Sequence, residues 1–277
     1  MPELPEVELV ARAVGRVVIG RIIVVAEMLR PKLLCDATPE DFAARLRGVT
    51  ITALGRRGKH ILFSFDRALT LIVHLRMTGR FLYLTPEQDL PKHTHVIFYL
   101  DNECRLIFVD PRQFGFMRLV ENDALHQTKE LANLAPEPLS DAFTAKVLYD
   151  SLQRSRRAIK ETLLDQTRVT GLGNIYAAEA LFMAGIHPQT VAADISRPRV
   201  KRLQQAIVEV LTESIAHGST MTVDPQSVES SYYGGPYEDH WRVYDRAGQP
   251  CSRCQTEIQR IVQGGRSTYF CPRCQRR

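Results

Sequence analysis

The sequence contains no long hydrophobic run and few cysteines for its length. The apolar stretch near the start, residues 14–29, is interrupted by Arg16, Arg21 and Glu27, so we expect neither a membrane-spanning helix nor a secretory signal. Internal repeats and low-complexity segments are also absent from the 277 residues. With 44% hydrophobic and 24% charged residues, the composition is typical of a folded chain of two or three domains. We therefore expect a soluble intracellular protein without membrane contacts.

Little excess charge exists outside the C-terminal tail. The net charge is +5, from 36 Lys and Arg against 31 Asp and Glu. Residues 251–277 carry six arginines and one glutamate, so the remainder of the chain is neutral. A basic module on a neutral body favours a polyanionic partner, and a solvated tail is the alternative.

Four of the six cysteines form two C-x-x-C pairs in this tail. Cys251 and Cys254 are separated from Cys271 and Cys274 by 16 residues, a spacing typical of a zinc site with four thiolate ligands. Four thiolates complete a tetrahedron, so we expect one structural Zn²⁺ per chain that takes no part in catalysis. Free buried thiols are the alternative. In either case the cysteine content favours a reducing cytoplasm.

Between the two cysteine pairs, the sequence predicts a β-hairpin. Ile258, Ile261 and Val262 are typical strand residues, and Gly264–Gly265 is typical of a tight turn. Arg266 would then project from the hairpin tip, where it could reach a phosphate or a groove. A solvated arginine is the alternative interpretation.

Hydrophobic periodicity divides the rest of the chain. Valines at helical spacing predict a helix over residues 5–18, and alternation over about 22–120 predicts a β-sandwich or barrel. After Pro136 and Pro138, we expect helices over 146–153, 157–165, 174–184 and 198–217. Residues 218–237 lack periodicity and are rich in Gly, Ser, Tyr and Pro, which is typical of a functional loop.

The first residues, Pro2-Glu3-Leu4-Pro5-Glu6, combine prolines with acidic side chains. Ordinary helix initiation explains such a pattern, because prolines and carboxylates are favoured in a first turn. Removal of the initiator methionine would also make Pro2 a secondary amine, whose pKa of roughly 7.7–8.0 leaves part of it unprotonated near neutral pH. Attack of this amine on a sugar C1′ would give a cationic iminium that promotes elimination, and Glu3 could exchange the proton.

In this order along the chain, residues 2–8, residues 160–188 and the cysteine module resemble the formamidopyrimidine-DNA glycosylase family of bifunctional base-excision repair enzymes. The resemblance implies an α+β multidomain fold with damaged duplex DNA, or duplex DNA with an abasic site, bound between two halves of a monomer. Its parts are an N-terminal catalytic β-sandwich with flanking helices (1–135), a helix-two-turn-helix DNA-binding domain (136–217), a lesion-capping loop and linker (218–242) and a zinc ribbon (243–277).

The resemblance also implies catalytic roles. Pro2 is the Schiff-base nucleophile, and Glu3 is the proton donor for base release and sugar opening, with Glu6 in the same pocket. Lys59 is the proton donor for β-elimination and a phosphate contact, whereas Arg266 serves δ-elimination and DNA binding. The implied reaction is removal of an oxidised purine, 8-oxoguanine or a formamidopyrimidine, followed by β,δ-elimination at the abasic site.

A second set of residues is implied in DNA binding. Met77, Arg112 and Phe114 match the trio that fills the gap left by a flipped base, although Met77 and Phe114 taken alone would be core residues. The implied contacts to the DNA backbone are His93, Arg156, Lys160 and Asn174. A metal site at the H-x-H pair that begins with His93 is a weaker interpretation, since no third ligand is evident.

The preferred lesion remains open at this point, because residues 219–242 lack the usual core of the family's capping loop. Leu4 favours the purine-directed branch over an endonuclease VIII-like enzyme for oxidised pyrimidines. A non-catalytic protein that binds damaged DNA on the same scaffold is the alternative from another class. Such a protein would need neither Pro2 nor Glu3.

Overall fold

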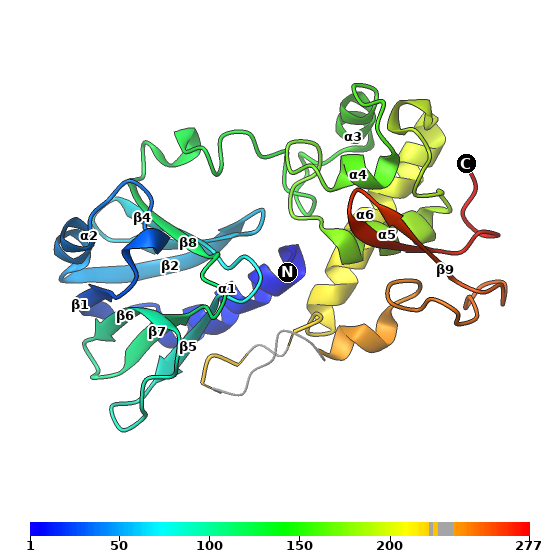
Figure 1. Ribbon diagram of the computed structural model, residues 1–277. Helices are drawn as coiled ribbons and strands as arrows, with labels where there is room; N and C mark the ends of the chain where they lie inside the picture. Colours follow the sequence, from blue (N-terminus) through cyan, green and yellow to red (C-terminus); the bar gives the residue numbers. More distant parts are fainter. Residues whose placement is uncertain (222–223, 227–234) are drawn as a thin grey trace. The chain divides into compact units, whose positions relative to one another are not determined.

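The computed structural model describes residues 1–221, 224–226 and 235–277, which belong to two compact units (Figure 1). Unit 1 contains Met1–Ala132 together with the described part of Gly218–Gly235. Unit 2 contains Asn133–His217 and Pro236–Arg277. Among the helices of the described ranges, none combines the length and the apolar character needed to cross a membrane.

Unit 1 contains helix α1 (Leu4–Val18) and one antiparallel sheet in the strand order β5-β7-β6-β1-β2-β3-β4-β8. Helix α2 (Pro39–Leu46) and the short 3₁₀ turns η1 (Pro31–Leu33) and η2 (Leu125–Gln127) lie in its connections. The eight strands are β1 (Ile22–Met28), β2 (Val49–Arg57), β3 (His60–Phe65), β4 (Leu69–His74), β5 (Arg80–Leu84), β6 (Thr94–Leu100), β7 (Arg105–Val109) and β8 (Phe116–Glu121).

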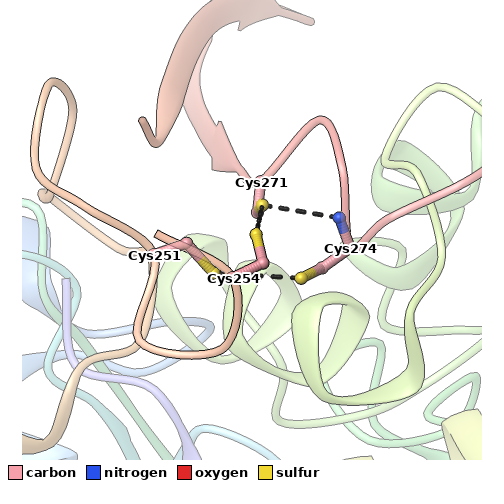
Figure 2. Close-up of side chains that lie close together, drawn as sticks. All are labelled: Cys251, Cys254, Cys271 and Cys274. Atoms are coloured by element: carbon pink, nitrogen blue, oxygen red, sulfur yellow. Dashed lines mark hydrogen bonds between the residues drawn. The ribbon is translucent and has the colours of Figure 1, made fainter. Parts of the chain in front are cut away.

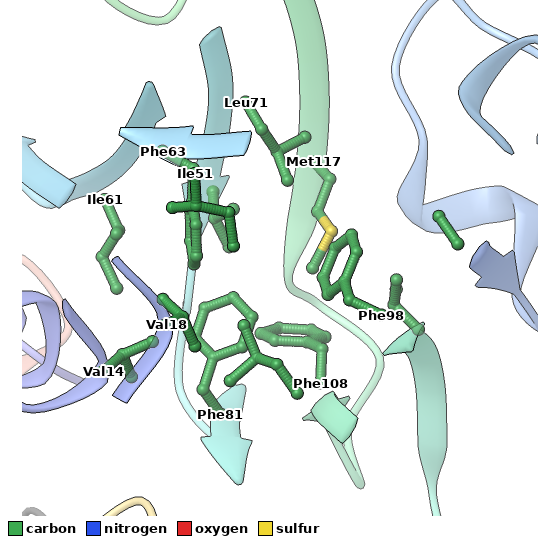
Figure 3. Close-up of a cluster of buried hydrophobic side chains, with 14 of the residues drawn as sticks. Val14, Val18, Ile51, Ile61, Phe63, Leu71, Phe81, Phe98, Phe108 and Met117 are labelled. Carbon is green, nitrogen blue, oxygen red and sulfur yellow. The ribbon is translucent and has the colours of Figure 1, made fainter. Parts of the chain in front are cut away.

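Aromatic contacts show that this sheet folds over itself. The ring centroids of Phe63 in β3 and Phe81 in β5 are 5.3 Å apart, although four strands separate β3 from β5 in the sheet order. Phe81 also contacts Phe108 of β7 at 5.2 Å, and Val14 and Val18 of α1 lie in the same core (Figure 3). The predicted β-sandwich and its N-terminal helix are therefore confirmed.

Helix α2 lies within the region that the alternating pattern assigns to strands. Thr38 caps it by accepting a hydrogen bond from the backbone N–H of Asp41, and Pro39 occupies the first turn, where its missing N–H has no cost. Phe42 and Leu46, one turn apart, are fully buried against the sandwich. The expectation of strands throughout residues 22–120 missed this helix, because eight residues give too short a periodic signal.

Unit 2 is built on a buried helix, α5 (Asn174–Ala184), that packs against α6 (Arg197–Ala216) and strand β10 (Arg266–Phe270). Gly185 ends α5 at φ +67, the left-handed conformation that glycine adopts without strain. The other elements are α3 (Ala145–Leu152), α4 (Ile159–Leu163), η3 (Ala192–Asp194), η4 (Pro236–His240) and β9 (Gln259–Gln263). The structure contains the four predicted helices, with α4 shorter than expected.

Phe63 provides a test of the folded-over sheet. We expect Phe63→Ala to lower the free energy of unfolding by about 3–5 kcal/mol, because it leaves a cavity between the two layers. Val24→Ala in β1 is the control, since Val24 is 46% exposed and its loss should cost less than about 1 kcal/mol. Urea denaturation followed by circular dichroism measures both changes, and equal losses would contradict the central position of Phe63.

Candidate active site

The start of α1 places Pro2, Glu3 and Glu6 in buried positions, with Glu3 and Glu6 only 3% and 2% exposed. Glu3 is the N-cap residue, and its backbone N–H donates to Oε2 of Glu6 at 2.8 Å. The Glu3 side chain accepts in return from the backbone N–H of Glu6, which completes a capping box. These reciprocal hydrogen bonds fix Glu3 at the beginning of the helix, next to Pro2.

Lys59 lies in the tight turn between β2 and β3, which the structure packs against α1. Arg56 connects the two elements, because its Nε donates to Glu8 Oε2 of α1 and its Nη1 donates to the carbonyl oxygen of Gly58, each at 3.0 Å. Gly58 adopts φ +58, and Lys59 is 6% exposed. Sequence reasoning missed this pair, because Arg56 and Glu8 are 48 residues apart.

Two histidines follow this turn. The rings of His60 and His74 meet edge to face at 4.8 Å, and both also contact Phe116. Burial lowers the pKa of His60 to about 4. Burial, followed by the nearby His60 and Arg76, also lowers the pKa of His74 far below its ordinary value. Both rings are therefore neutral at pH 7, so the positive charge here belongs to lysine and arginine.

The structure brings Met77, Arg112 and Phe114 together, as the resemblance implies. Arg112 Nη1 lies 3.0 Å from the Met77 sulfur, and its guanidinium carbon lies 4.8 Å from the centre of the Phe114 ring. Phe114 is 53% exposed, which excludes the alternative that it is a core residue. An exposed aromatic ring held by an arginine is suited to stacking on bases.

Asp110 organises the two turns that carry this trio. Its fully buried carboxylate accepts hydrogen bonds from the Thr78 hydroxyl and, at 2.8 Å, from the backbone N–H of Gly115. The Thr78 hydroxyl oxygen in turn accepts from the backbone N–H of Arg112 at 3.2 Å. Sequence reasoning did not assign a role to Asp110, although it immediately precedes the Pro-Arg-Gln-Phe-Gly motif. The role of Asp110 becomes apparent only in the folded structure, which brings its hydrogen-bond donors together.

His93 is exposed and lies beside the Asp110 turn. Its carbonyl oxygen accepts from the backbone N–H of Asp110 at 3.1 Å, and its backbone adopts φ +67. Arg76 and Gln113 also have positive φ values, +54 and +57. Non-glycine residues with positive φ store backbone strain, so surrounding contacts must hold these turns in place.

In unit 2, the expected DNA contacts are divided between buried and exposed positions. Lys160 is 1% exposed, and its Nζ donates to the Ser267 carbonyl at 2.9 Å and to Thr268 Oγ1 at 2.7 Å. Nδ2 of Asn174 donates to the same Ser267 carbonyl at 3.0 Å. These bonds tie α4 and α5 to β10. Because Lys160 is almost fully buried, a phosphate could reach its ammonium group only if the surrounding residues move.

Arg266 and Arg156 are exposed in the same unit. Arg266 begins β10 and pairs with Gln263 across a turn in which Gly264 and Gly265 have φ values of +55 and +73, as a tight hairpin requires. The predicted hairpin is therefore present, and Arg266 lies at its end. Arg156 is 86% exposed and within 3.4 Å of Asp194, so its side chain is accessible to a phosphate.

The four cysteines of the tail meet in one cluster with Sγ atoms within 4.8 Å of one another (Figure 2). The Sγ–Sγ distances are 3.9 Å for Cys251–Cys274 and 3.5 Å for Cys254–Cys271. A tetrahedron with Zn–S bonds of about 2.3 Å has edges of about 3.8 Å, so the cluster fits zinc. All four ligand positions are filled by thiolates, which defines a structural zinc ion.

Glu179 anchors the segment that leads into this zinc module. The carboxylate is fully buried in α5 and accepts from the backbone N–H groups of Arg242, Val243 and Tyr244 at 2.8–2.9 Å. Burial raises its pKa, and the three N–H donors oppose that shift. Sequence reasoning missed Glu179, because an acidic residue in the middle of a helix gives no signal of a partner 63 residues away.

Comparisons with known families cover nearly all of the chain. The formamidopyrimidine-DNA glycosylase N-terminal domain matches residues 1–117, and the H2TH domain of the same enzymes matches residues 134–225. The zinc finger found in FPG and IleRS matches residues 248–277. These matches define a zinc-finger protein of the DNA glycosylase class.

Individual relatives agree over full length. The formamidopyrimidine-DNA glycosylase of Desulforamulus reducens is 42% identical over 277 residues, which span 100% of this chain and 99% of the relative. The enzyme of Chloroflexus aurantiacus is 45% identical, with coverage of 99% and 98%. The chain belongs to the formamidopyrimidine-DNA glycosylase family.

Solved structures support the same conclusion. Lactococcus lactis Fpg in complex with DNA containing an abasic site is 34% identical and superposes with a TM-score of 0.91, covering 99% of this chain and 100% of that one. A complex of wild-type Lactococcus lactis Fpg with DNA containing an oxidised pyrimidine is 35% identical, with a TM-score of 0.90 and full coverage of both chains.

The zinc cluster leads to a first prediction for this site. We expect Cys254→Ser to release zinc and unfold the β9–β10 hairpin, because a structural zinc site supplies much of the folding energy of so small a module. Zinc content by atomic absorption, together with protease sensitivity near residue 260, measures the effect. Cys104→Ser is the matched control, because Cys104 lies far from the cluster in sequence and in unit 1. Retention of one zinc per chain in the Cys254 variant would contradict the assignment.

The buried histidines lead to a second prediction, on the pH dependence of stability. The pKa of His60 is lower in the folded protein than in the unfolded chain, so the unfolded state binds more protons below about pH 6.5. Stability should therefore be complete above that pH and fall on acidification toward pH 4, at up to about 1.4 kcal/mol per pH unit for this group. We expect His60→Gln to flatten this slope in urea unfolding at pH 7.5, 6 and 5. An unchanged slope would show that His60 does not titrate on unfolding.

Proposed function

We propose that this protein removes 8-oxoguanine and formamidopyrimidines from duplex DNA and then cleaves the strand by β,δ-elimination. Membership in the family makes the chain a base-excision repair glycosylase and abasic-site lyase. The observation that carries the proposal is the capping box that holds Glu3 beside the buried Pro2, with the Lys59 turn packed on the same helix. A capping box alone is ordinary helix initiation, but a protein that only binds DNA would need neither Pro2 nor a Glu3 held beside it.

Pro2 is the nucleophile once Met1 is removed. Its amine attacks C1′ of the damaged nucleotide, and the base leaves with the electrons of the glycosidic bond. Glu3 supplies the proton for base release, takes up the N–H proton that Pro2 loses after attack, and returns it to the ring oxygen as the sugar opens, which leaves an iminium between Pro2 and C1′. The iminium acidifies C2′, so water takes up the C2′ proton, the electrons of that bond form a C2′–C3′ double bond, and the phosphate on the 3′ side departs in β-elimination.

Lys59 and Arg266 serve the elimination steps in this proposal. The Lys59 ammonium is the proton donor during β-elimination and contacts a phosphate, and Arg266 assists the second elimination, which releases the phosphate on the 5′ side. Met77, Arg112 and Phe114 fill the gap left by the extruded base. His93, Arg156, Lys160 and Asn174 are the proposed contacts to the DNA backbone.

Zinc has a structural role in the proposal. Held by Cys251, Cys254, Cys271 and Cys274, it supplies no chemistry to the reaction and maintains the fold of the hairpin that ends at Arg266. We further propose that the protein acts as a monomer in the bacterial cytoplasm, with Pro2, Glu3 and Lys59 in the catalytic domain 1–135, DNA-binding helices in 136–217, a lesion-capping segment in 218–242 and Arg266 in the zinc ribbon 243–277.

The proposed lesion class is oxidised purines rather than oxidised pyrimidines. Relatives that are 40–45% identical over the whole chain are named for formamidopyrimidine, which is an opened purine base. Excision should therefore be compared between a duplex with 8-oxoguanine and a duplex with thymine glycol. Excision of thymine glycol alone would contradict the purine assignment while leaving the shared mechanism intact.

Borohydride trapping tests the proposed nucleophile. We expect the methionine-processed protein to form a covalent adduct on a duplex with 8-oxoguanine opposite cytosine and on an abasic duplex, because borohydride reduces the iminium at Pro2. Mass mapping should place the adduct on Pro2, and Pro2→Gly, which retains a terminal amine of a different kind, should trap much less. An adduct that maps to a lysine would contradict the role of Pro2.

A further inference from the structure

The Glu6 carboxylate joins two parts of unit 1 that are far apart in sequence. Its Oε2 accepts the backbone N–H of Glu3 at 2.8 Å. Its Oε1 accepts the Thr220 hydroxyl at 2.9 Å and the Thr220 backbone N–H at 3.3 Å. Thr220 is 5% exposed, so this connection is buried at both ends. One carboxylate therefore connects a catalytic residue to a residue 214 positions away from Glu6.

The fold holds Thr220 firmly on its other sides. Ser219, fully buried, adopts φ +61, and the Met221 side chain belongs to the sandwich core. The backbone N–H of Gly235 donates to the Thr220 carbonyl at 3.3 Å. A Cβ at Gly235 would lie 2.3 Å from the backbone nitrogen of Met221, so only glycine permits this approach. Thr220 is thus a fixed point that can orient Glu6.

The position of Glu3 depends on the orientation of this carboxylate. Glu6 and Glu3 form the two halves of the capping box, so a rotated Glu6 side chain would release the Glu3 N–H and loosen the first turn of α1. Hydrogen bonds to a buried carboxylate are strong, because the low local dielectric strengthens them and burial leaves no water to replace them. The Thr220 hydroxyl donates the shortest bond that holds Oε1.

We propose that Thr220 is a positioning residue for base release, acting through Glu6 on Glu3. This inference rests on the proposed function, in which the Glu3 carboxyl donates the proton that accompanies base departure and ring opening. A preformed abasic site has already lost its base and presents an open-chain aldehyde for part of the time. Attack of Pro2 on that aldehyde does not use the protonation for base release, so the two activities should respond differently to Thr220.

Two substitutions separate the hydroxyl from the shape of the side chain. Thr220→Val keeps the branched shape and removes the donor, whereas Thr220→Ser keeps the donor. On a duplex with 8-oxoguanine opposite cytosine, we expect single-turnover excision by the valine variant to fall by roughly 10- to 100-fold, the effect of losing one hydrogen bond to a charged group. The serine variant should excise at close to the wild-type rate. Borohydride trapping on an abasic duplex should be nearly unchanged for both.

Thermal unfolding of the three proteins accompanies these assays. Wild-type excision by Thr220→Val would overturn the proposal, and so would an equal loss of excision and of abasic-site trapping, which indicates a general structural defect. Failure of Thr220→Ser to restore excision would also overturn it, because the donor would then not be the cause. An inactive wild-type protein would instead contradict the proposed function, so the two failures are distinguishable.

Discussion

Buried carboxylates that accept backbone N–H groups hold the functional segments of both units. Glu6 fixes the first turn of α1, Asp110 the turns around Arg112, and Glu179 the segment that enters the zinc module. A buried carboxylate is tolerated only when hydrogen bonds compensate its lost hydration, and converging backbone donors provide this compensation. Each carboxylate therefore selects one conformation for a helix start, a turn or a connecting segment. The side chains proposed for catalysis and for DNA contact are positioned by these acceptors.

In unit 1, the strained backbone conformations lie in turns, and the packed sandwich supports these turns. The sandwich supplies a packed core in which Phe63 and Phe81 join the layers, and the turns at its edge contain Arg76, His93 and Gln113 in left-handed conformations. Such conformations persist only where surrounding contacts over-determine them. The Asp110 carboxylate and the core beneath it provide those contacts. The Phe114 ring can then remain exposed, as the proposed stacking on a base requires, instead of packing onto the sheet.

Local signals in the sequence were sufficient for much of the fold. Residues 174–184 were predicted as a helix with the bounds that α5 has, because glycines flank both of its ends. The C-x-x-C pairs likewise predicted the cysteine cluster from spacing alone. Helix α2 could not be predicted because its periodic signal is too short. The inward direction of Lys160 and the partners of Asp110 and Glu6 depend on contacts between distant parts of the chain. Catalytic roles came from the family resemblance rather than from any periodic pattern.

The contacts of the Ser267 carbonyl oxygen indicate which cationic side chains of unit 2 can be substituted. Lys160 and Asn174 both donate to it, so two helices converge on one atom of the strand that begins at Arg266. Arg156 is exposed, so a lysine in its place would still present a solvated cation, without the paired N–H donors that a guanidinium offers a phosphate. A planar guanidinium in place of the buried Lys160 ammonium would not reproduce its two bonds. We therefore expect substitutions to be tolerated at exposed cations such as Arg156 and to be poorly tolerated at the buried Lys160.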